Sequence, residues 1–177
     1  QLAPYLAMPV LVSKMTRCFV LVGLILTMMV NEMKASEETM RGITSSFLKV
    51  LDQCKRELTL GDHILSDLYH FWKEDASLVH RDTGCAIVCM SDKLELLDTS
   101  GKLHRGNAQE FAVKNGAAED VAVKLVTLVH GCEQQHEANE DGCLRALDVA
   151  KCFRSSLREL QWAPTMEVVV SEVLTEI

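Results

Sequence analysis

Apolar residues recur every three or four positions along most of the chain, which is the spacing of one face of an α-helix. In the first clear example the apolar positions run from Met40 to Leu58, with charged residues between them. The other segments with this pattern are 62–72, 84–97, 107–111, 119–133 and 142–160. Since no segment alternates apolar and polar residues convincingly, the sequence predicts an all-α domain.

Capping and turn residues separate these segments. Asp62 and Asn107 each precede an apolar pattern, and we expect them to cap the helices that follow. Residues 98–101, Asp-Thr-Ser-Gly, have the composition of a turn and open a polar connection. These signals predict helices joined by short polar loops.

The N-terminal part has the pattern of a secretory signal peptide. Arg17 precedes an apolar run over 18–30, and the small residue Ala35 follows a short polar stretch. The run is short for a membrane span, which needs about 20 apolar residues. We therefore expect a translated leader over 1–14, a signal peptide over 15–35 and a secreted domain over 36–177 that ends in a tail, 163–177.

Six cysteines remain in the expected secreted domain, and an even number in that compartment predicts disulfides. They are Cys54, Cys85, Cys89, Cys132, Cys143 and Cys152, at intervals of 30, 3, 42, 10 and 8 residues. Spacing alone leaves their pairing open. Because Cys85 and Cys89 share one helix face, separate partners are favoured for the two. A zinc site that combines cysteines with His130 and His136 is disfavoured by the oxidising route and by the lack of paired CxxC motifs. We expect no metal.

Charge and composition exclude several functions. A net charge of -7 and an aromatic content of 5% argue against nucleic acid as a partner. No GxSxG, HExxH, Walker or GxGxxG string occurs, and no histidine–aspartate pair has the spacing found in small disulfide-rich phospholipases. His63, His70 and His80 are expected at the surface. We therefore expect neither an enzyme nor a cofactor.

The cysteine spacing and five local strings resemble the insect odorant-binding proteins, and within them the pheromone-binding proteins of moths. The strings are FWKED (71–75), RDTGCAIVCMSDKL (81–94), HRGNAQEFA (104–112), VHGCE (129–133) and QWAP (161–164). The resemblance covers residues 36–177. General odorant-binding proteins share much of the pattern, whereas GNAQEFA and the Trp162-Ala163-Pro164 string favour the pheromone-binding branch.

The resemblance implies six or seven helices around an apolar cavity, closed by three particular disulfides. These would be Cys54–Cys89, Cys85–Cys143 and Cys132–Cys152. It also implies a soluble extracellular carrier, located in the sensillum lymph, for a long-chain acetate, aldehyde or alcohol. The carrier would act near membrane odorant receptors, and the resemblance leaves a homodimer open.

Fourteen positions match the ligand pocket of the family, and Arg145 is a further polar candidate. The fourteen are Met40, Thr44, Phe47, Phe71, Trp72, Ile87, Ser91, Leu96, Leu97, Leu103, Phe111, Val126, Val129 and Phe153. Phe47 and Phe153 would provide flat walls for an unsaturated chain. The Ser91 hydroxyl would bond a ligand oxygen, or else the carbonyl one turn back. Helical periodicity by itself favours a different interpretation, in which these apolar side chains pack against each other in a filled core. It likewise favours an Arg145 side chain that is exposed to solvent.

The C-terminal tail combines apolar residues with Glu167, Glu172 and Glu176. Burial of such a tail is costly while the acids are charged and becomes favourable once they are protonated. In the family the tail enters the cavity at acidic pH and displaces the ligand. His104 and His130 would become charged over the same mildly acidic range. Arg105 stands where many moth relatives carry a second histidine, which implies a weaker or shifted switch.

Two alternatives to a pheromone carrier stay open at this point. The first is a general odorant-binding protein that carries plant volatiles. The second, from a different class, is a secreted helical signal or inhibitor protein. Such a protein would act through its surface and have a filled interior, so the presence of a cavity discriminates between the two classes.

Overall fold

The structure is a computed structural model that describes residues 19, 20, 22, 38–73 and 79–163. The chain divides into two units, Gln1–Ala35 and Ser36–Ile177, and each is described by itself. In the first unit, residues 19, 20 and 22 are helical. The expected leader and signal peptide fall almost entirely outside the described residues, and so do residues 164–177 of the expected tail. Everything that follows concerns the second unit.

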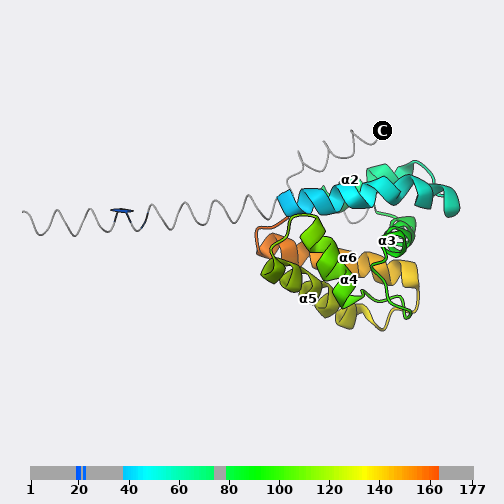
Figure 1. Ribbon diagram of the computed structural model, residues 1–177. Helices are drawn as coiled ribbons and strands as arrows, with labels where there is room; N and C mark the ends of the chain where they lie inside the picture. The colour runs from blue at the N-terminus through cyan, green and yellow to red at the C-terminus, as the bar shows by residue number, and fades with distance from the viewer. Residues whose placement is uncertain (1–18, 21, 23–37, 74–78, 164–177) are drawn as a thin grey trace, which may run out of the picture. The chain divides into compact units, whose positions relative to one another are not determined.

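Six α-helices make up the described part of this unit (Figure 1). They are the helix over residues 38–57, α2 (His63–Lys73), α3 (Arg81–Lys93), α4 (Arg105–Lys114), α5 (Glu119–His136) and α6 (Gly142–Glu159). Within residues 38–73 and 79–163 the only β-pairing is an isolated bridge between Leu97 and Leu103. The all-α prediction is confirmed.

Two helix boundaries differ from those predicted. α3 begins at Arg81 and ends at Lys93. It ends earlier than predicted because Glu95 takes a positive φ of 57° and the Leu96 N–H donates to the Ser91 carbonyl at 2.8 Å. α4 begins after His104, whose ring Nδ1 accepts a hydrogen bond from the Asn107 N–H. His104, and not Asn107, is therefore the cap of α4.

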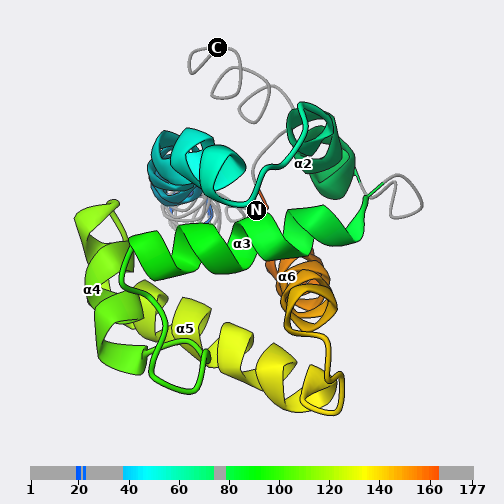
Figure 2. The ribbon, with the colours of Figure 1, turned by 90° about the vertical axis from the view of Figure 1, so that its right-hand side faces the viewer.

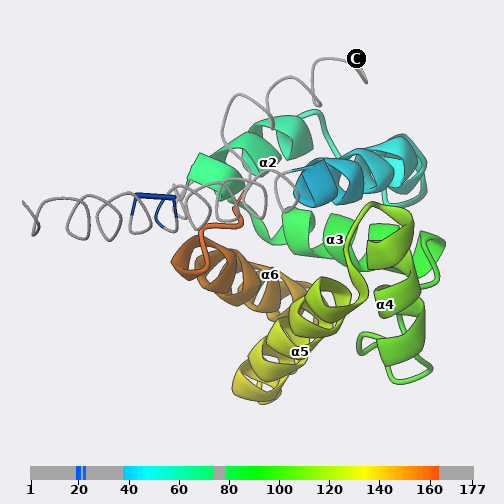
Figure 3. The ribbon, with the colours of Figure 1, turned by 60° about the vertical axis from the view of Figure 1, so that its left-hand side comes forward.

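Each helix buries its apolar face against its neighbours. α3 packs against α2 and α6, α6 also packs against α5, and α5 packs against α4 (Figures 2 and 3). One apolar cluster gathers around Met40, Leu125 and Leu157, and a second around Leu51 and Ile64. The helix over residues 38–57 contributes to both clusters and so connects the two parts of the core.

Three disulfides join the helices. Cys54–Cys89 links the helix over residues 38–57 to α3, Cys85–Cys143 links α3 to α6, and Cys132–Cys152 links α5 to α6. Cys85 and Cys89 have separate partners, as their shared helix face indicated. The pairing implied by the family resemblance is confirmed.

Gly84 allows α3 to approach α6 closely beside the Cys85–Cys143 disulfide. A Cβ atom at Gly84 would overlap the backbone carbonyl of Cys143 and press on the Cβ of Leu147. Backbone atoms that are held by a disulfide have little freedom to move aside. The absence of a side chain at Gly84 is therefore a requirement of the packing.

We expect Gly84→Ala to lower the free energy of unfolding by about 1–3 kcal/mol or more, because the methyl group overpacks the α3–α6 contact. Urea denaturation measures this change. Gly131→Ala is the matched control in α5, since a Cβ there meets no atom within 4 Å. The control should be neutral or slightly stabilising, because alanine has the higher helix propensity. A Gly84→Ala protein as stable as the control would contradict the described α3–α6 contact.

Candidate ligand-binding site

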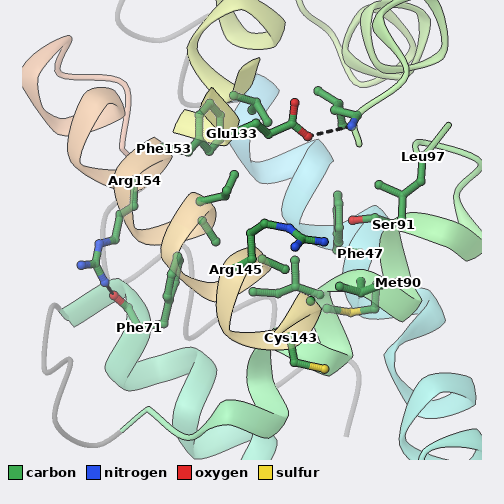
Figure 4. Close-up of a pocket in the computed structure, with 18 of the residues that line it drawn as sticks. Phe47, Phe71, Met90, Ser91, Leu97, Glu133, Cys143, Arg145, Phe153 and Arg154 are labelled. Atoms are coloured by element: carbon green, nitrogen blue, oxygen red, sulfur yellow. Dashed lines mark hydrogen bonds between the residues drawn. The ribbon is translucent and has the colours of Figure 1, made fainter. Parts of the chain in front are cut away.

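A cavity of about 840 Å³ lies among the helices. This volume falls within the range of about 300–1,000 Å³ that is typical of ligand pockets. Its walls come from the helix over residues 38–57, from α2, α3, α5 and α6, and from the loop that connects α3 to α4 (Figure 4). Most of the lining side chains are apolar. The structure therefore has room for a ligand where a filled bundle would have side chains.

Twelve of the predicted contact residues line this cavity. They are Met40, Thr44, Phe47, Phe71, Trp72, Ile87, Ser91, Leu97, Leu103, Val129, Arg145 and Phe153. Leu96, Phe111 and Val126 are not among its lining residues. Leu96 and Val126 are each only 3% exposed, packed within the protein interior. The ring of Phe111 packs edge-on against Phe47, with 5.9 Å between the centroids, so Phe111 supports a wall residue instead.

Sequence reasoning missed several wall residues on α6. Ala146, Val149 and Ala150 line the cavity together with Phe153. These positions are three or four residues apart, so the helical period is their signal in the sequence. However, apolar residues that pack against a neighbouring helix have the same period, so the sequence does not show which of the two roles they have. The small alanine side chains leave space along this face of α6.

Aromatic rings from three helices surround the space. Figure 4 shows Phe47 from the helix over residues 38–57, Phe71 from α2 and Phe153 from α6 around the cavity. The rings of Phe71 and Trp72 pack edge-to-face at 5.4 Å. Such rings provide flat apolar surfaces against which an alkyl or unsaturated chain can lie.

Ser91 brings a hydroxyl group to the cavity wall. The residue is 8% exposed, and its hydroxyl makes no hydrogen bond to any described protein group. Thr44, by contrast, lines the same cavity but donates its hydroxyl to the Met40 carbonyl at 2.8 Å. An apolar ligand that covers this hydroxyl without bonding it would leave it unpaired, at a cost of about 1–3 kcal/mol. Ser91 is therefore the lining residue best placed to bond a polar group on an apolar ligand.

Arg145 brings a positive charge to the same cavity. Figure 4 shows its guanidinium group directed into the space between α6 and Phe47. Its Nη1 donates a hydrogen bond to the Asn139 carbonyl at 2.7 Å, which holds the side chain inward. The solvated arginine favoured by periodicity is therefore not what the structure has. A guanidinium group at the cavity wall is a hydrogen-bond donor for an oxygen atom of a ligand.

Glu133 fastens the loop after α3 to α5 at the cavity wall. Its Oε1 accepts the Leu103 N–H at 2.7 Å, which is the dashed bond in Figure 4, and its Oε2 lies 2.8 Å from the His130 Nδ1. A second link joins Lys102 to Glu137 at 2.7 Å. The hydrogen bond from Lys102 lowers the pKa of Glu137, so this ion pair survives until the pH falls below the ordinary glutamate range.

The predicted pH-sensitive residues lie in different places. His130 contacts Glu133 beside the cavity, whereas His104 caps α4. Glu167, Glu172 and Glu176 lie outside the described residues.

In the part of the chain that the structure describes, no helix combines the length and apolar character needed to cross a membrane.

Helices tied by three disulfides around an apolar cavity define a class of small proteins built to enclose a ligand. The chain belongs to the PBP/GOBP family, whose profile matches residues 36–156. Members of this family are binding proteins, which confirms the expectation that the chain is not an enzyme.

Two relatives and one solved structure place the chain within this family. Pheromone-binding protein 2 of Epiphyas postvittana is 45% identical over 142 residues, which are 80% of this chain and 86% of that protein. General odorant-binding protein 1 of Antheraea pernyi is 37% identical over 150 residues, or 85% and 90% of the two chains. The crystal structure of Epiphyas postvittana pheromone binding protein 3 has a TM-score of 0.60 and 59% identity, and the match covers 63% of this chain and 95% of that one. Relatives of both branches are thus similar to this chain.

Proposed function

We propose that the chain is an extracellular carrier that holds a long-chain pheromone or odorant in the helical cavity. The cavity of about 840 Å³, with apolar walls and a Ser91 hydroxyl that bonds no described protein group, is the observation that supports this function most strongly. Each buried methylene contributes about 0.8 kcal/mol to binding, so a long alkyl chain gains affinity from the walls. An acetate, aldehyde or alcohol oxygen would meet Ser91 or Arg145. The names of the relatives, which are pheromone-binding and general odorant-binding proteins, support the same ligand class.

A fluorescent apolar probe tests this function. We expect one probe molecule to bind per chain, and long-chain acetates, aldehydes and alcohols to displace it competitively. Stronger displacement by small plant volatiles would favour the general odorant-binding branch. A chain that binds no probe, and whose activity depends only on surface residues, would support the secreted signal or inhibitor alternative and contradict the carrier.

We expect Ser91→Ala to weaken binding of a long-chain alcohol by about two- to tenfold, because one hydrogen bond of about 0.5–1.5 kcal/mol is lost. Binding of the alkane of equal length should not change. Thr44→Val is the matched control, since the Thr44 hydroxyl is already bonded to Met40. Competition against the probe measures the affinity of the unmodified chain and of both variants for the alcohol and for the alkane. An equal effect of Ser91→Ala on alcohol and alkane would show that Ser91 does not hold the head group.

The proposed carrier releases its ligand on acidification near the receptor membrane, either as a single chain or as a homodimer. Two features support this proposal. The tail carries Glu167, Glu172 and Glu176, which would lose their charge at low pH and allow the apolar tail residues to enter the cavity. Glu133 also holds the loop at Leu103 to the cavity wall and contacts His130, so opening of the cavity at this loop requires these contacts to break.

A chain that ends at Pro164 tests the role of the tail. We expect this truncated chain to bind the probe as the full chain does at neutral pH, and to keep it at mildly acidic pH. The full chain should lose the probe over that range, because only the full chain can insert the apolar tail. A fluorescence titration from neutral to acidic pH measures both. If the truncated chain loses the probe as the full chain does, the tail is not the displacing element.

A further inference from the structure

Two histidines and a buried aspartate come together where α2 and α3 begin. His63 is the first residue of α2, Asp67 follows it one turn later, and His80 directly precedes α3. One nitrogen or oxygen atom from each lies within 4.8 Å of the others. None of the three lines the ligand cavity. The cluster is therefore separate from the carrier site.

The carboxylate of Asp67 is held in a fixed position. Its residue is 2% exposed, and its Oδ2 accepts hydrogen bonds from the Thr83 hydroxyl at 2.7 Å and from the His80 N–H at 2.8 Å. Its Oδ1 lies 3.0 Å from the His80 Nδ1. Two ligands of one tetrahedral zinc ion, at bond lengths of about 2.0–2.1 Å, stand about 3.3–3.4 Å apart. The His80 Nδ1 lies 3.0 Å from both oxygens of Asp67, which is a hydrogen-bond distance slightly shorter than this spacing, so a bound ion would replace the shared ring proton and move the two groups slightly apart.

His63 completes a triad of potential ligands. Its ring lies 5.3 Å from the His80 ring, centroid to centroid, and the two planes are inclined at 79°. The side chain of His63 is 39% exposed, so a small rotation can bring a ring nitrogen to an ion held by the other two residues. An open fourth position remains for water.

The charges around the cluster favour a cation. The Asp67 carboxylate accepts hydrogen bonds from the Thr83 hydroxyl and the His80 N–H, and such bonds favour the charged form of the group. Asp82 adds a second carboxylate, with its Oδ2 3.6 Å from the His63 Nε2. Neutral imidazole and carboxylate are both ordinary zinc ligands.

We propose that His63, Asp67 and His80 bind one Zn²⁺ ion, which ties the start of α2 to the start of α3. This differs from the expectation of no metal drawn from the sequence, which considered only the cysteines with His130 and His136. The proposed ion needs no cysteine, so it is compatible with the three disulfides. Nor does it depend on the proposed carrier function, because its ligands lie outside the cavity.

Calorimetric titration of the full-length chain with zinc chloride at neutral pH tests the proposal. A Cys18→Ser background removes the cysteine that takes part in none of the three disulfides. We expect one zinc ion per chain, and a loss of affinity of about tenfold or more in His63→Asn and in His80→Asn. Asparagine preserves the His80 backbone bond to Asp67 and is a good helix cap. His136→Asn, at the end of α5, is the matched control and should leave the affinity unchanged.

A second measurement does not depend on any of the histidine variants. On addition of zinc, the ring NMR signals of His63 and His80 should shift together with one-to-one saturation, while those of His136 should not. Absence of one-to-one binding, or ring shifts that do not involve His63 and His80, would overturn the proposal. So would an equal loss of affinity in His136→Asn and in the two cluster variants.

Discussion

Tryptophan at both Ala146 and Ala150 is expected to lower the affinity for an apolar fluorescent probe by about a hundredfold. The two alanines lie one turn apart on α6, and both line the cavity. Two indole rings in place of two methyl groups would occupy the space that the ligand needs. Loss of the wall contacts of three or four methylene groups, at about 0.8 kcal/mol each, corresponds to this factor, since each factor of ten in affinity is about 1.4 kcal/mol.

The control for this variant places the same side chain on the surface. Val123 is 46% exposed on α5 and does not line the cavity, so Val123→Trp should bind the probe as the unmodified chain does. Circular dichroism should show that both variants keep their helices. If the folded double variant binds the probe at unchanged affinity, the probe lies outside the described cavity.

The second large effect is expected from the disulfide between α3 and α6. Replacement of Cys85 and Cys143 together by serine should lower the free energy of unfolding by about 4 kcal/mol, because the unfolded chain gains the freedom of a long loop. This is a large part of the roughly 5–15 kcal/mol by which proteins of this kind are stable. Urea denaturation of the unmodified chain and the double variant measures the difference.

The other two disulfides provide an internal comparison. The bonded cysteines are 58 residues apart in Cys85–Cys143, 35 in Cys54–Cys89 and 20 in Cys132–Cys152. The loop-entropy account therefore predicts that the cost of removal falls in this order. A protein that loses more stability without Cys132–Cys152 than without Cys85–Cys143 would contradict it.

The fold was largely predictable from the sequence because its helices are amphipathic and its cysteines follow a family spacing. The helical period located every described helix to within a few residues. The early end of α3 was not predictable, since the positive φ of Glu95 falls on a residue that gives no turn signal. The disulfide pairing came from the resemblance, because the residues alone specify no distances between helices.

The site was predictable in part. Most of the fourteen family positions line the cavity, but Leu96, Phe111 and Val126 do not. A stripe of apolar residues has the same pattern whether it borders a packed neighbour or an empty space, and this is also why Ala146 and Ala150 were missed. His63 and His80 were expected at the surface, and both are exposed. They meet at Asp67 because α2 packs against α3, and a linear pattern does not report such a contact.

Isotope-filtered NOE measurement on the chain bound to a long-chain alcohol tests the central claim, binding inside the cavity, most directly. We predict that the ligand methylene protons show contacts to cavity residues from three helices, such as Phe47, Ile87 and Val149. Contacts confined to exposed apolar residues such as Leu58, Val113 and Val123, with none to the cavity wall, would contradict the account.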